Sequence, residues 1–338
     1  MRSLRIESIG ISEIYEAPEP VVQEADVLLK INHVGLCGTD LSTFSGLNPN
    51  VALPRIPGHE IGAEVLYCGP NASGSLSPGD RVVVVPYTAC GGCTSCRKGR
   101  INACRYNKTL GVQQDGALAE RFAWPATKLI PNKTLQPRDL ALVEPLAVGF
   151  HAVERGRVQP EDTVVVLGCG VIGLGAIAGA VARGANVVAV DVSESKASLA
   201  CTLGASCAVI GKGEEVIQEI LRITNGDGAD VVIEAVGLPE TYTLAIDLVS
   251  FAGRVVYVGY TKEIVSYKTQ VFNLKELDIH GSRNATEKDF FAVIKYLEAL
   301  GDETKIFVSM VLPIEKANQA LPYWASNRNN ITKIIIEM

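Results

Sequence analysis

The sequence lacks the features that mark membrane, exported and nucleic-acid-binding proteins. Its 338 residues contain no uninterrupted apolar run of about 18 residues, the length that a membrane-spanning helix needs. The first ten residues, MRSLRIESIG, lack the apolar segment of a secretory signal peptide. Acidic residues outnumber basic ones, 37 to 31, and a net charge of −6 disfavours nucleic acid or anionic membrane as the main partner. We therefore expect a cytoplasmic protein that binds neither nucleic acid nor membrane.

Cysteine is not scarce, because the chain has nine. Without an export signal, cysteines indicate metal ligands and reduced thiols before disulfides. The composition, 47% hydrophobic and 20% charged, is that of an ordinary globular protein, and the length leaves room for two cores. We expect two domains.

One stretch predicts a dinucleotide site. The apolar run Val164–Leu167 has no alternation, which is typical of a parallel strand buried on both faces. Gly168, Gly170 and Gly173 follow at the G-x-G-x-x-G spacing. The first glycine permits a tight turn, the second lets the backbone approach a pyrophosphate, and the third lets the next helix pack closely on the strand. That helix offers free N–H groups to phosphate.

The acidic residue Asp191 favours NAD over NADP. It ends a second apolar strand, Asn186–Val190, where a carboxylate can accept hydrogen bonds from both hydroxyls of an adenosine ribose. The same carboxylate repels a 2′-phosphate. Because strand, glycines, helix, strand and acid appear in this order, the pattern predicts NAD binding rather than an isolated glycine turn.

The rest of the chain changes character twice. The first 149 residues contain mainly short strands separated by Gly and Pro, and residues 150–280 alternate strands with helices, as βαβ units do. Beyond Gly281 we expect a helix at 286–300, a strand near 306–312, a helix opened by Pro313 and a closing strand at 331–337. This tail is expected to return to the first domain.

Four cysteines predict a structural zinc site. Cys90, Cys93, Cys96 and Cys104 form C-x2-C-x2-C-x7-C in one short segment. Four thiolates close a tetrahedral zinc shell and leave no open position. An iron–sulfur cluster also takes four thiolates, but ferredoxin spacings differ, and disulfide pairing is the weaker alternative.

A second, scattered set supplies one sulfur, one nitrogen and two carboxylates. Its members are Cys37 in GLCGTD, His59 and Glu60 in PGHEIG, and Glu144 in VEPLAVGFHA. Taken singly, each has a plain structural explanation, such as a buried thiol or a surface charge. Together they can form an open zinc site with three protein ligands, able to bind an alcohol oxygen and lower its pKa.

These motifs together resemble the zinc-dependent medium-chain dehydrogenase/reductases, the alcohol dehydrogenase superfamily, over nearly the whole chain. The resemblance implies an α/β protein in which a GroES-like, β-rich catalytic domain, residues 1–149 plus 281–338, contains an inserted Rossmann domain with a doubly wound parallel sheet, residues 150–280. The structural zinc lobe is expected at about 88–106. The motifs that carry the likeness are GLCGTD, GHEIG, GDRV, the four cysteines, Glu144-Pro145 and the glycine fingerprint with Asp191.

The nearest branch is that of the polyol and sugar-acid dehydrogenases. It implies a catalytic zinc held by Cys37, His59 and one glutamate at a time, with Glu60 and Glu144 able to alternate. The chain is therefore expected to hold two zinc ions. Glu144 is also expected to lie at the substrate.

The resemblance assigns further roles to the GLCGTD segment. Thr39 matches the hydroxyl that accepts the substrate proton, and Asp40 matches the carboxylate that orients the ligand histidine. Ser42 stands where many relatives carry a proton-relaying histidine. The proton route is therefore open, with Ser42 and a cofactor ribose hydroxyl as one candidate.

The NAD contacts come from the second domain. Lys196 matches a lysine that touches the adenosine ribose. The residues expected to bind NAD are Gly168, Gly170, Val171, Ile172, Gly173, Asp191, Lys196, Val236 and Val258.

Arg283 and Asn284, in HGSRNATEKDF, are expected to contact the substrate. In related polyol dehydrogenases an arginine at this place faces the substrate pocket. Its guanidinium can bind a carboxylate through two hydrogen bonds, which favours a sugar acid. It can equally bind the hydroxyls of a neutral polyol, or pair with Glu287 or Asp289 on the next helix.

The expected function is NAD-dependent oxidation of a secondary alcohol in a sugar acid of the L-galactonate or L-gulonate kind. The alternatives are a polyol such as sorbitol or galactitol, and L-threonine or a simple alcohol. A non-enzymatic NAD-binding role is disfavoured because the zinc ligands are intact. A homo-oligomer, dimeric or tetrameric, is expected.

Overall fold

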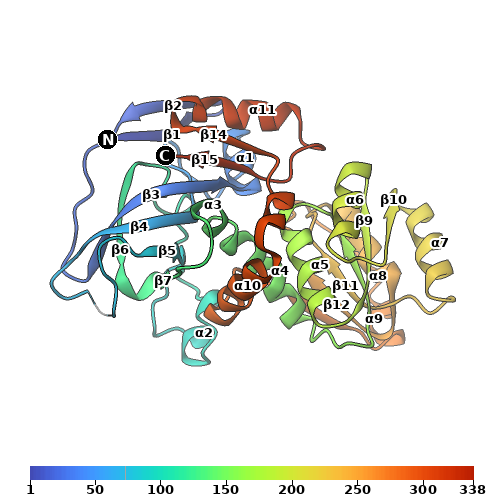
Figure 1. Cartoon of the computed structure of the whole chain (residues 1–338). Coiled ribbons are helices and arrows are strands. Elements are labelled where there is room, and N and C mark those ends of the chain that lie inside the picture. Colours follow the sequence, from blue (N-terminus) through green and yellow to red (C-terminus); the bar gives the residue numbers. More distant parts are fainter. Residues whose placement is uncertain (73) are drawn as a thin grey trace. The chain divides into compact units, whose positions relative to one another are not determined.

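The computed structural model describes residues 1–72 and 74–338, which form two compact units (Figure 1). Unit 1 comprises Met1–Glu144 and Val293–Met338, and unit 2 comprises Pro145–Ala292. The units divide within α4 (Val143–Arg155) and α10 (Glu287–Leu300) rather than at the expected boundaries, 149/150 and 280/281. The boundaries differ because each of these two helices carries residues of both units.

Unit 1 is built on a seven-stranded sheet in the described part of the chain (Figure 1). The strands run in the order β14-β15-β3-β4-β5-β7, and β6 pairs with β3. The closing strand β15 lies antiparallel to β3, so the tail belongs to this sheet. A separate hairpin pairs β1 with β2. The strands are β1 (Arg2–Ser8), β2 (Ile11–Glu16), β3 (Asp26–Leu36), β4 (Glu60–Cys68), β5 (Arg81–Val84), β6 (Arg121–Pro125), β7 (Leu129–Pro131), β14 (Met310–Pro313) and β15 (Ile334–Glu337).

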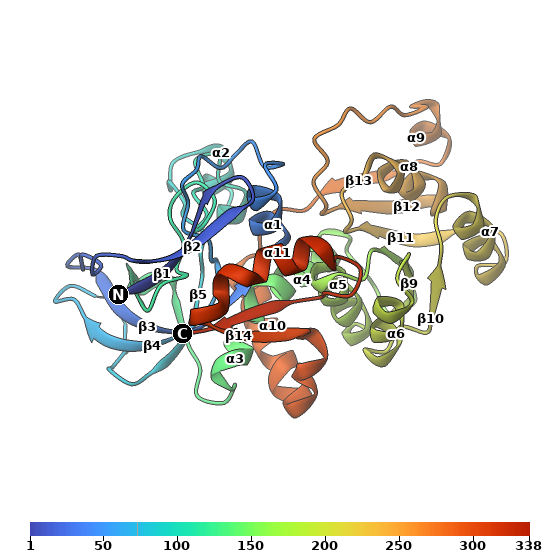
Figure 2. The same ribbon diagram turned by 90° about the horizontal axis from the view of Figure 1, so that it is seen from above.

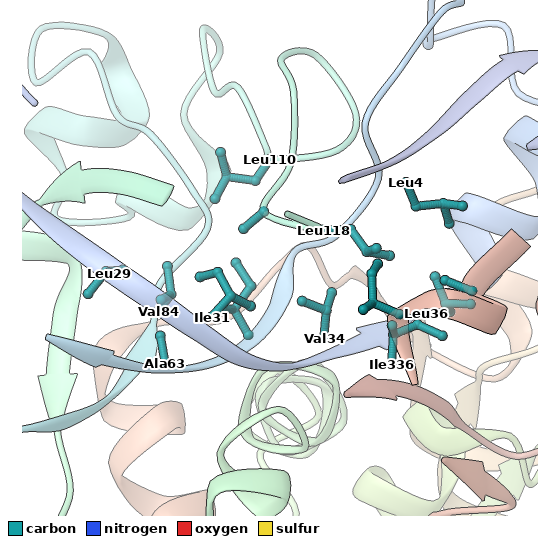
Figure 3. Close-up of a cluster of buried hydrophobic side chains, with 14 of the residues drawn as sticks. Leu4, Leu29, Ile31, Val34, Leu36, Ala63, Val84, Leu110, Leu118 and Ile336 are labelled. Atoms are coloured by element: carbon teal, nitrogen blue, oxygen red, sulfur yellow. The ribbon is translucent and has the colours of Figure 1, made fainter. Parts of the chain in front are cut away.

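The core of unit 1 follows the two-residue period of its strands. Leu29 and Ile31 of β3 are buried, whereas Lys30 between them is exposed. Figure 3 shows their side chains beside Ala63 of β4 and Val84 of β5, with other buried residues that come from distant parts of the sequence. Full burial of each large aliphatic side chain contributes about 1.5–3 kcal/mol.

The helices of unit 1 are short. One of them, α1, begins directly after β3 and places GLCGTD at a strand end. The tail differs from expectation: residues 301–307 form a 3-10 helix, and Pro313 ends β14 and precedes another 3-10 helix. The helices are α1 (Gly38–Phe44), α2 (Thr94–Arg97), α3 (Pro137–Leu140) and α11 (Ala320–Ser326), with 3-10 turns at Ile101–Ala103, Ala126–Lys128, Gly301–Phe307 and Ile314–Gln319.

Unit 2 contains the expected doubly wound parallel sheet. Its six strands run in the order β10-β9-β8-β11-β12-β13, and every neighbouring pair is parallel. Figure 2 shows α5 and α6 on one face and α8 on the other. The strand order reverses beside β8, which is where such sheets bind their ligands. The elements are β8 (Thr163–Leu167), α5 (Val171–Ala182), β9 (Asn186–Asp191), α6 (Glu194–Thr202), β10 (Cys207–Ile210), α7 (Glu214–Ile223), β11 (Ala229–Glu234), α8 (Pro239–Leu248), β12 (Val249–Tyr257), α9 (Gln270–Leu274) and β13 (Asp278–Gly281).

Among the described residues, no helix combines the length and the apolar character that are needed to cross a bilayer.

Candidate active site and metal centres

The glycine fingerprint forms the turn between β8 and α5. Gly168 has φ +92°, a conformation that favours glycine, and Gly170 is the N-cap of α5. A side chain on Gly173 would overlap the carbonyl oxygen of Gly168, so only glycine lets the helix lie this close to the turn. The structure therefore gives each of the three glycines the geometry that the motif requires.

Among the described helices that follow strands of this sheet, α5 and α7 each begin at a glycine, whereas α6 and α8 begin with a polar side chain on a first N–H group. The hydroxyl of Ser193 caps α6, and the Leu238 N–H at the start of α8 donates to the hydroxyl of Thr241. Gly170 can offer no side-chain cap to α5. The first N–H groups of α5, which directly follow the glycine fingerprint, are thus left for a pyrophosphate.

Asp191 is held rigidly where β9 ends. Its Oδ2 accepts the backbone N–H of Cys169 at 2.7 Å, and its Oδ1 accepts that of Ser193 at 2.8 Å. The carboxylate is therefore fixed beside the glycine turn. Lys196, one turn into α6, is half-buried, and this burial lowers its pKa while Asp191 opposes the shift.

The four cysteines of the lobe converge as expected. Their sulfur atoms all lie within 4.8 Å of one another. Cys93 Sγ is 3.5 Å from Cys96 Sγ and 3.9 Å from Cys104 Sγ, too far for a disulfide. A tetrahedral zinc with bonds of about 2.3 Å requires sulfur separations of roughly 3.8 Å, so the cluster fits zinc.

Backbone N–H groups surround these sulfurs. Cys93 N–H points to Cys90 Sγ at 3.4 Å, and the N–H groups of Cys90 and Tyr106 point to Cys104 Sγ, each at 3.3 Å. Such donors stabilise thiolates. The hydroxyl of Ser95 and backbone N–H groups lower the pKa of Cys93 to about 5, which favours the ligand form of this thiol.

The second candidate centre forms where β3 and β4 pair. Cys37 follows β3, His59 precedes β4, and Glu60 is the first residue of β4, where the pairing sets it opposite Gly35. One ligand atom from each of Cys37, His59 and Glu60 lies within 4.8 Å of the others. Sulfur, imidazole nitrogen and carboxylate oxygen form a donor set that suits a catalytic zinc with an open position.

A buried lysine, missed in the sequence, pairs with Glu60. Lys333 Nζ lies 2.6 Å from Oε1 and 2.5 Å from Oε2 of Glu60 and donates to the carbonyl of Leu36 at 2.8 Å. Both side chains are 0% exposed. A side chain on Gly35 would collide with this carboxylate, which explains that glycine of GLCGTD. The available signal was a lysine directly before the apolar run Ile334–Ile336.

Glu144 is held by a different partner. The phenol of Tyr87, also missed in the sequence, donates a hydrogen bond to Glu144 Oε1. Among the described residues, the group with Cys37 and His59 includes Glu60 and not Glu144. Burial raises the pKa of Glu144 to about 7, and burial beside Glu144 raises that of Tyr87 well above its ordinary value. The two glutamates therefore have separate anchors.

Residues of α1 follow Cys37 directly and lie beside it. Asp40 is buried, and its Oδ2 accepts the backbone N–H of Cys37 at 2.8 Å. His59 Nδ1 is buried with no hydrogen-bond partner among the described residues. Asp40 thus orients the cysteine loop, and its role in orienting the histidine stays a prediction. Burial disfavours the charged His59 imidazolium, but Cys37 and Asp40 raise its pKa well above the ordinary value.

The hydroxyls of α1 differ in availability. Ser42 Oγ donates to the carbonyl of Gly38 at 3.0 Å, so its proton is engaged within the helix. Thr39 is partly exposed, and its backbone carbonyl accepts the hydroxyl of Thr43 at 2.9 Å. The proton roles of Thr39 and Ser42 stay predictions.

The segment with Arg283 and Asn284 follows β13 in unit 2. Asn284 has φ +52°, and both side chains are partly exposed. Asp289 anchors the end of this segment: its Oδ2 accepts Thr286 N–H at 2.7 Å and the Thr286 hydroxyl at 2.6 Å, and it lies 2.9 Å from His151 Nδ1. His151 of α4 therefore holds this carboxylate from a second helix.

Comparisons with known proteins agree with this geometry. Residues 23–134 match the family described as "Alcohol dehydrogenase GroES-like domain", and residues 171–299 match "Zinc-binding dehydrogenase". The chain is similar to L-galactonate-5-dehydrogenase of Escherichia coli K12, 36% identical over 87% of this chain and 85% of the relative. It is also similar to a sorbitol dehydrogenase of Halalkalibacterium halodurans, 30% identical over 97% and 96%.

A solved structure shows the same fold. Galactitol-1-phosphate dehydrogenase from Escherichia coli matches with a TM-score of 0.89 and 27% identity over 100% of both chains. The expected GroES-like and Rossmann architecture is thereby confirmed, as are the expected enzyme class and the zinc and nicotinamide cofactors of that class. The chain therefore belongs to the zinc-binding alcohol dehydrogenases of the medium-chain dehydrogenase/reductase superfamily, in their polyol and sugar-acid branch.

Proposed function

We propose that this dehydrogenase oxidises a secondary alcohol of a sugar acid, of the L-galactonate or L-gulonate kind, with NAD as the hydride acceptor. The observation that carries the oxidation is the convergence of Cys37, His59 and Glu60 on one point. The choice of a sugar acid is supported by the 36% identity to L-galactonate-5-dehydrogenase and by the guanidinium of Arg283, which can bind a carboxylate through two hydrogen bonds.

The cofactor roles follow from the site. When bound, zinc acts as a Lewis acid on an alcohol oxygen, and NAD accepts a hydride. Asp191, anchored by the backbone N–H groups of Cys169 and Ser193, favours the ribose of NAD over the 2′-phosphate of NADP.

The residues of unit 1 prepare the metal position. Lys333 holds the Glu60 carboxylate beside the ligand atoms of Cys37 and His59. Tyr87 holds Glu144, which is available as the alternate ligand or as an acceptor for a substrate hydroxyl. Thr39 Oγ1 is assigned to take the hydroxyl proton of the substrate.

A neutral polyol is the second candidate, supported by the likeness to sorbitol dehydrogenase and to galactitol-1-phosphate dehydrogenase. The first experiment follows NADH formation by the zinc-loaded protein with L-galactonate and L-gulonate beside galactitol and sorbitol. Turnover of the acids in preference to the alditols supports the proposal. Preference for the alditols would replace it with polyol oxidation.

The Arg283→Ala variant tests the carboxylate contact. Loss of a charge-assisted pair is expected to raise KM for the acids by about ten- to a hundred-fold and to change KM for alditols much less. Arg283→Lys is the matched control, because it keeps the charge and loses the two-pronged geometry, and it should recover only part of the affinity. An equal rise of KM for acids and alditols would contradict a contact between Arg283 and a substrate carboxylate.

Cellular context and assembly are further parts of the proposal. Four free cysteines arranged as ligands need a reducing compartment, which supports a cytoplasmic site of action. A symmetric homo-oligomer, dimer or tetramer, is the general expectation for such an enzyme, and light scattering at several concentrations distinguishes the two.

A further inference from the structure

Glu234, the last residue of β11, is a fully buried carboxylate that none of the roles above uses. Its Oε1 accepts the N–H groups of Val236 at 2.9 Å and Gly237 at 2.7 Å, and the hydroxyl of Thr241 at 2.8 Å. Burying a carboxylate is costly unless hydrogen bonds and dipoles compensate. Here three donors on Oε1 and the N-terminal end of α8 compensate, while Oε2 is buried with no hydrogen-bond partner among the described residues.

The same residue joins two loops. Its backbone carbonyl accepts the N–H groups of Val258 at 2.9 Å and Gly259 at 3.1 Å, which follow β12. Tyr242 of α8 donates its hydroxyl to the carbonyl of Gly259 at 2.6 Å. A side chain on Gly259 would lie 2.7 Å from Glu234 Oε2, so glycine is required there. Glu234 therefore fixes the loop 235–238 and the loop after β12 as one assembly.

The position of this assembly follows from the order of the strands. Asp191 ends β9, and α5, with its free N–H groups, follows β8. The sheet order β9-β8-β11-β12 places the loops after β11 and β12 on the other side of β8 from Asp191. A dinucleotide with its ribose at Asp191 and its pyrophosphate at α5 must therefore extend its nicotinamide half over the loop 235–238.

The loop also touches the glycine turn. A side chain on Gly168 would lie 2.7 Å from Cγ2 of Val236, and the backbone N–H of Ala235 donates to the carbonyl of Leu167 at 2.9 Å. Val236 itself is 43% exposed. A shift of the loop would thus move Val236 relative to the turn that takes the pyrophosphate.

We propose that Glu234 is a positioning residue for the nicotinamide half of NAD. Its carboxylate, together with Thr241, holds the loop 235–238 in the conformation that this half contacts. The proposal depends on the nicotinamide cofactor and not on the choice of alcohol substrate.

The test measures NADH and ADP binding to the zinc-loaded protein by calorimetry, without any alcohol substrate. ADP carries the adenosine half alone. Glu234→Gln keeps the shape of the side chain but replaces the carboxylate, and Thr241→Val removes one donor. Each variant is expected to raise the dissociation constant of NADH, Glu234→Gln by about ten-fold and Thr241→Val by less. The dissociation constant of ADP should stay within about two-fold.

Asp162 provides a matched control at the opposite edge of the same sheet. It is a buried carboxylate that accepts Arg254 Nη2 at 2.6 Å and the N–H of Gln159 at 2.7 Å. Asp162→Asn is expected to lower the Tm and leave the affinities for NADH and ADP unchanged. Asp191→Asn should instead lower the affinity for NADH and the affinity for ADP together.

Two results would overturn the proposal. One is an unchanged NADH affinity in Glu234→Gln despite a lowered Tm, which would make the carboxylate a structural element only. The other is an equal loss of affinity for NADH and for ADP. If Glu234→Gln does not fold, Thr241→Val decides by the same two criteria. Because no alcohol is present, the outcome is independent of the substrate proposal.

Discussion

The two candidate metal centres of unit 1 are built in opposite ways. The cysteine cluster takes all four sulfurs from residues 90–104, on a lobe where Cys90 is exposed and only Cys104 is buried. The centre with Cys37, His59 and Glu60 combines two segments through the β3–β4 pairing, and its supporting lysine is 273 residues from Glu60 in the sequence. One site is a local folding unit, whereas the other depends on the whole sheet.

This difference explains how each centre is stabilised. Backbone N–H groups of the same segment surround the lobe sulfurs. The second centre instead uses buried side chains from distant elements, Lys333 for Glu60 and Tyr87 for Glu144. We expect substitutions in the lobe to act mainly on stability, and substitutions in the second centre to act on chemistry as well.

The largest expected effect separates the two centres directly. Cys37→Ser removes the only thiolate of the β3–β4 centre, and loss of several kcal/mol of charge stabilisation corresponds to at least about a thousand-fold loss of kcat/KM. Cys93→Ser is the matched change in the lobe, and it should lower the Tm while activity at low temperature is largely kept. Steady-state kinetics beside thermal melts measures both.

The contrary outcome would be equally informative. If Cys93→Ser abolished turnover at a temperature where the protein stays folded, the lobe would take part in the chemistry. Metal analysis of each variant provides the control, since Cys37→Ser and Cys93→Ser should each lose about one zinc ion of the expected two.

The contrast between the centres also shows what sequence reasoning can reach. Features within one short segment could be predicted from the sequence, because residue spacing alone defines the four-cysteine segment and the glycine turn. The tail was predicted less well: the strand expected near 306–312 starts only at Met310, because residues 301–307 form a 3-10 helix. A short apolar run such as the one at 306–312 fits a helix or a strand equally well.

Long-range partners were beyond such reasoning for a different reason. A lone Lys333 before an apolar strand or a Tyr87 before the cysteine segment has no local pattern, and only the folded sheet brings them to Glu60 and Glu144. The carboxylates themselves were found because they stand inside motifs. What the sequence could not supply was which group holds each one.

The second prediction tests that support. Lys333→Met leaves the Glu60 carboxylate fully buried without its partner, which should cost about 3–5 kcal/mol of unfolding free energy. Denaturant titration measures the loss. Adding Glu60→Gln to Lys333→Met removes the unpaired charge and should recover much of it. If the single and double variants are equally unstable, the lysine acts through packing instead of charge.

The smallest expected effect concerns the pH dependence of the zinc-free protein. Burial raises the folded-state pKa of Glu144 from 4.5 to about 7, so between these values the folded state binds more protons than the unfolded state. The contribution of Glu144 to stability is therefore full below about pH 4.5 and falls by up to about 1.4 kcal/mol per pH unit as the pH rises toward 7. Melts between pH 4.5 and 6.5 avoid the range above 6.5, where His59, with its raised pKa, adds a fall of the same sign.

Variants of the Glu144 pair sharpen this last prediction. Glu144→Gln should flatten the slope, since no proton is then released on unfolding at that position. Tyr87→Phe removes a hydrogen bond that lowers the pKa of Glu144, so it should extend the slope to higher pH. The lobe variant Cys93→Ser should lower the curve and steepen its fall above about pH 5, because the lowered pKa of the Cys93 thiol contributes a stability that rises with pH there. If the pH dependence of stability is unchanged in Glu144→Gln, the titrating group lies outside this pair. That result would contradict the raised pKa assigned to Glu144.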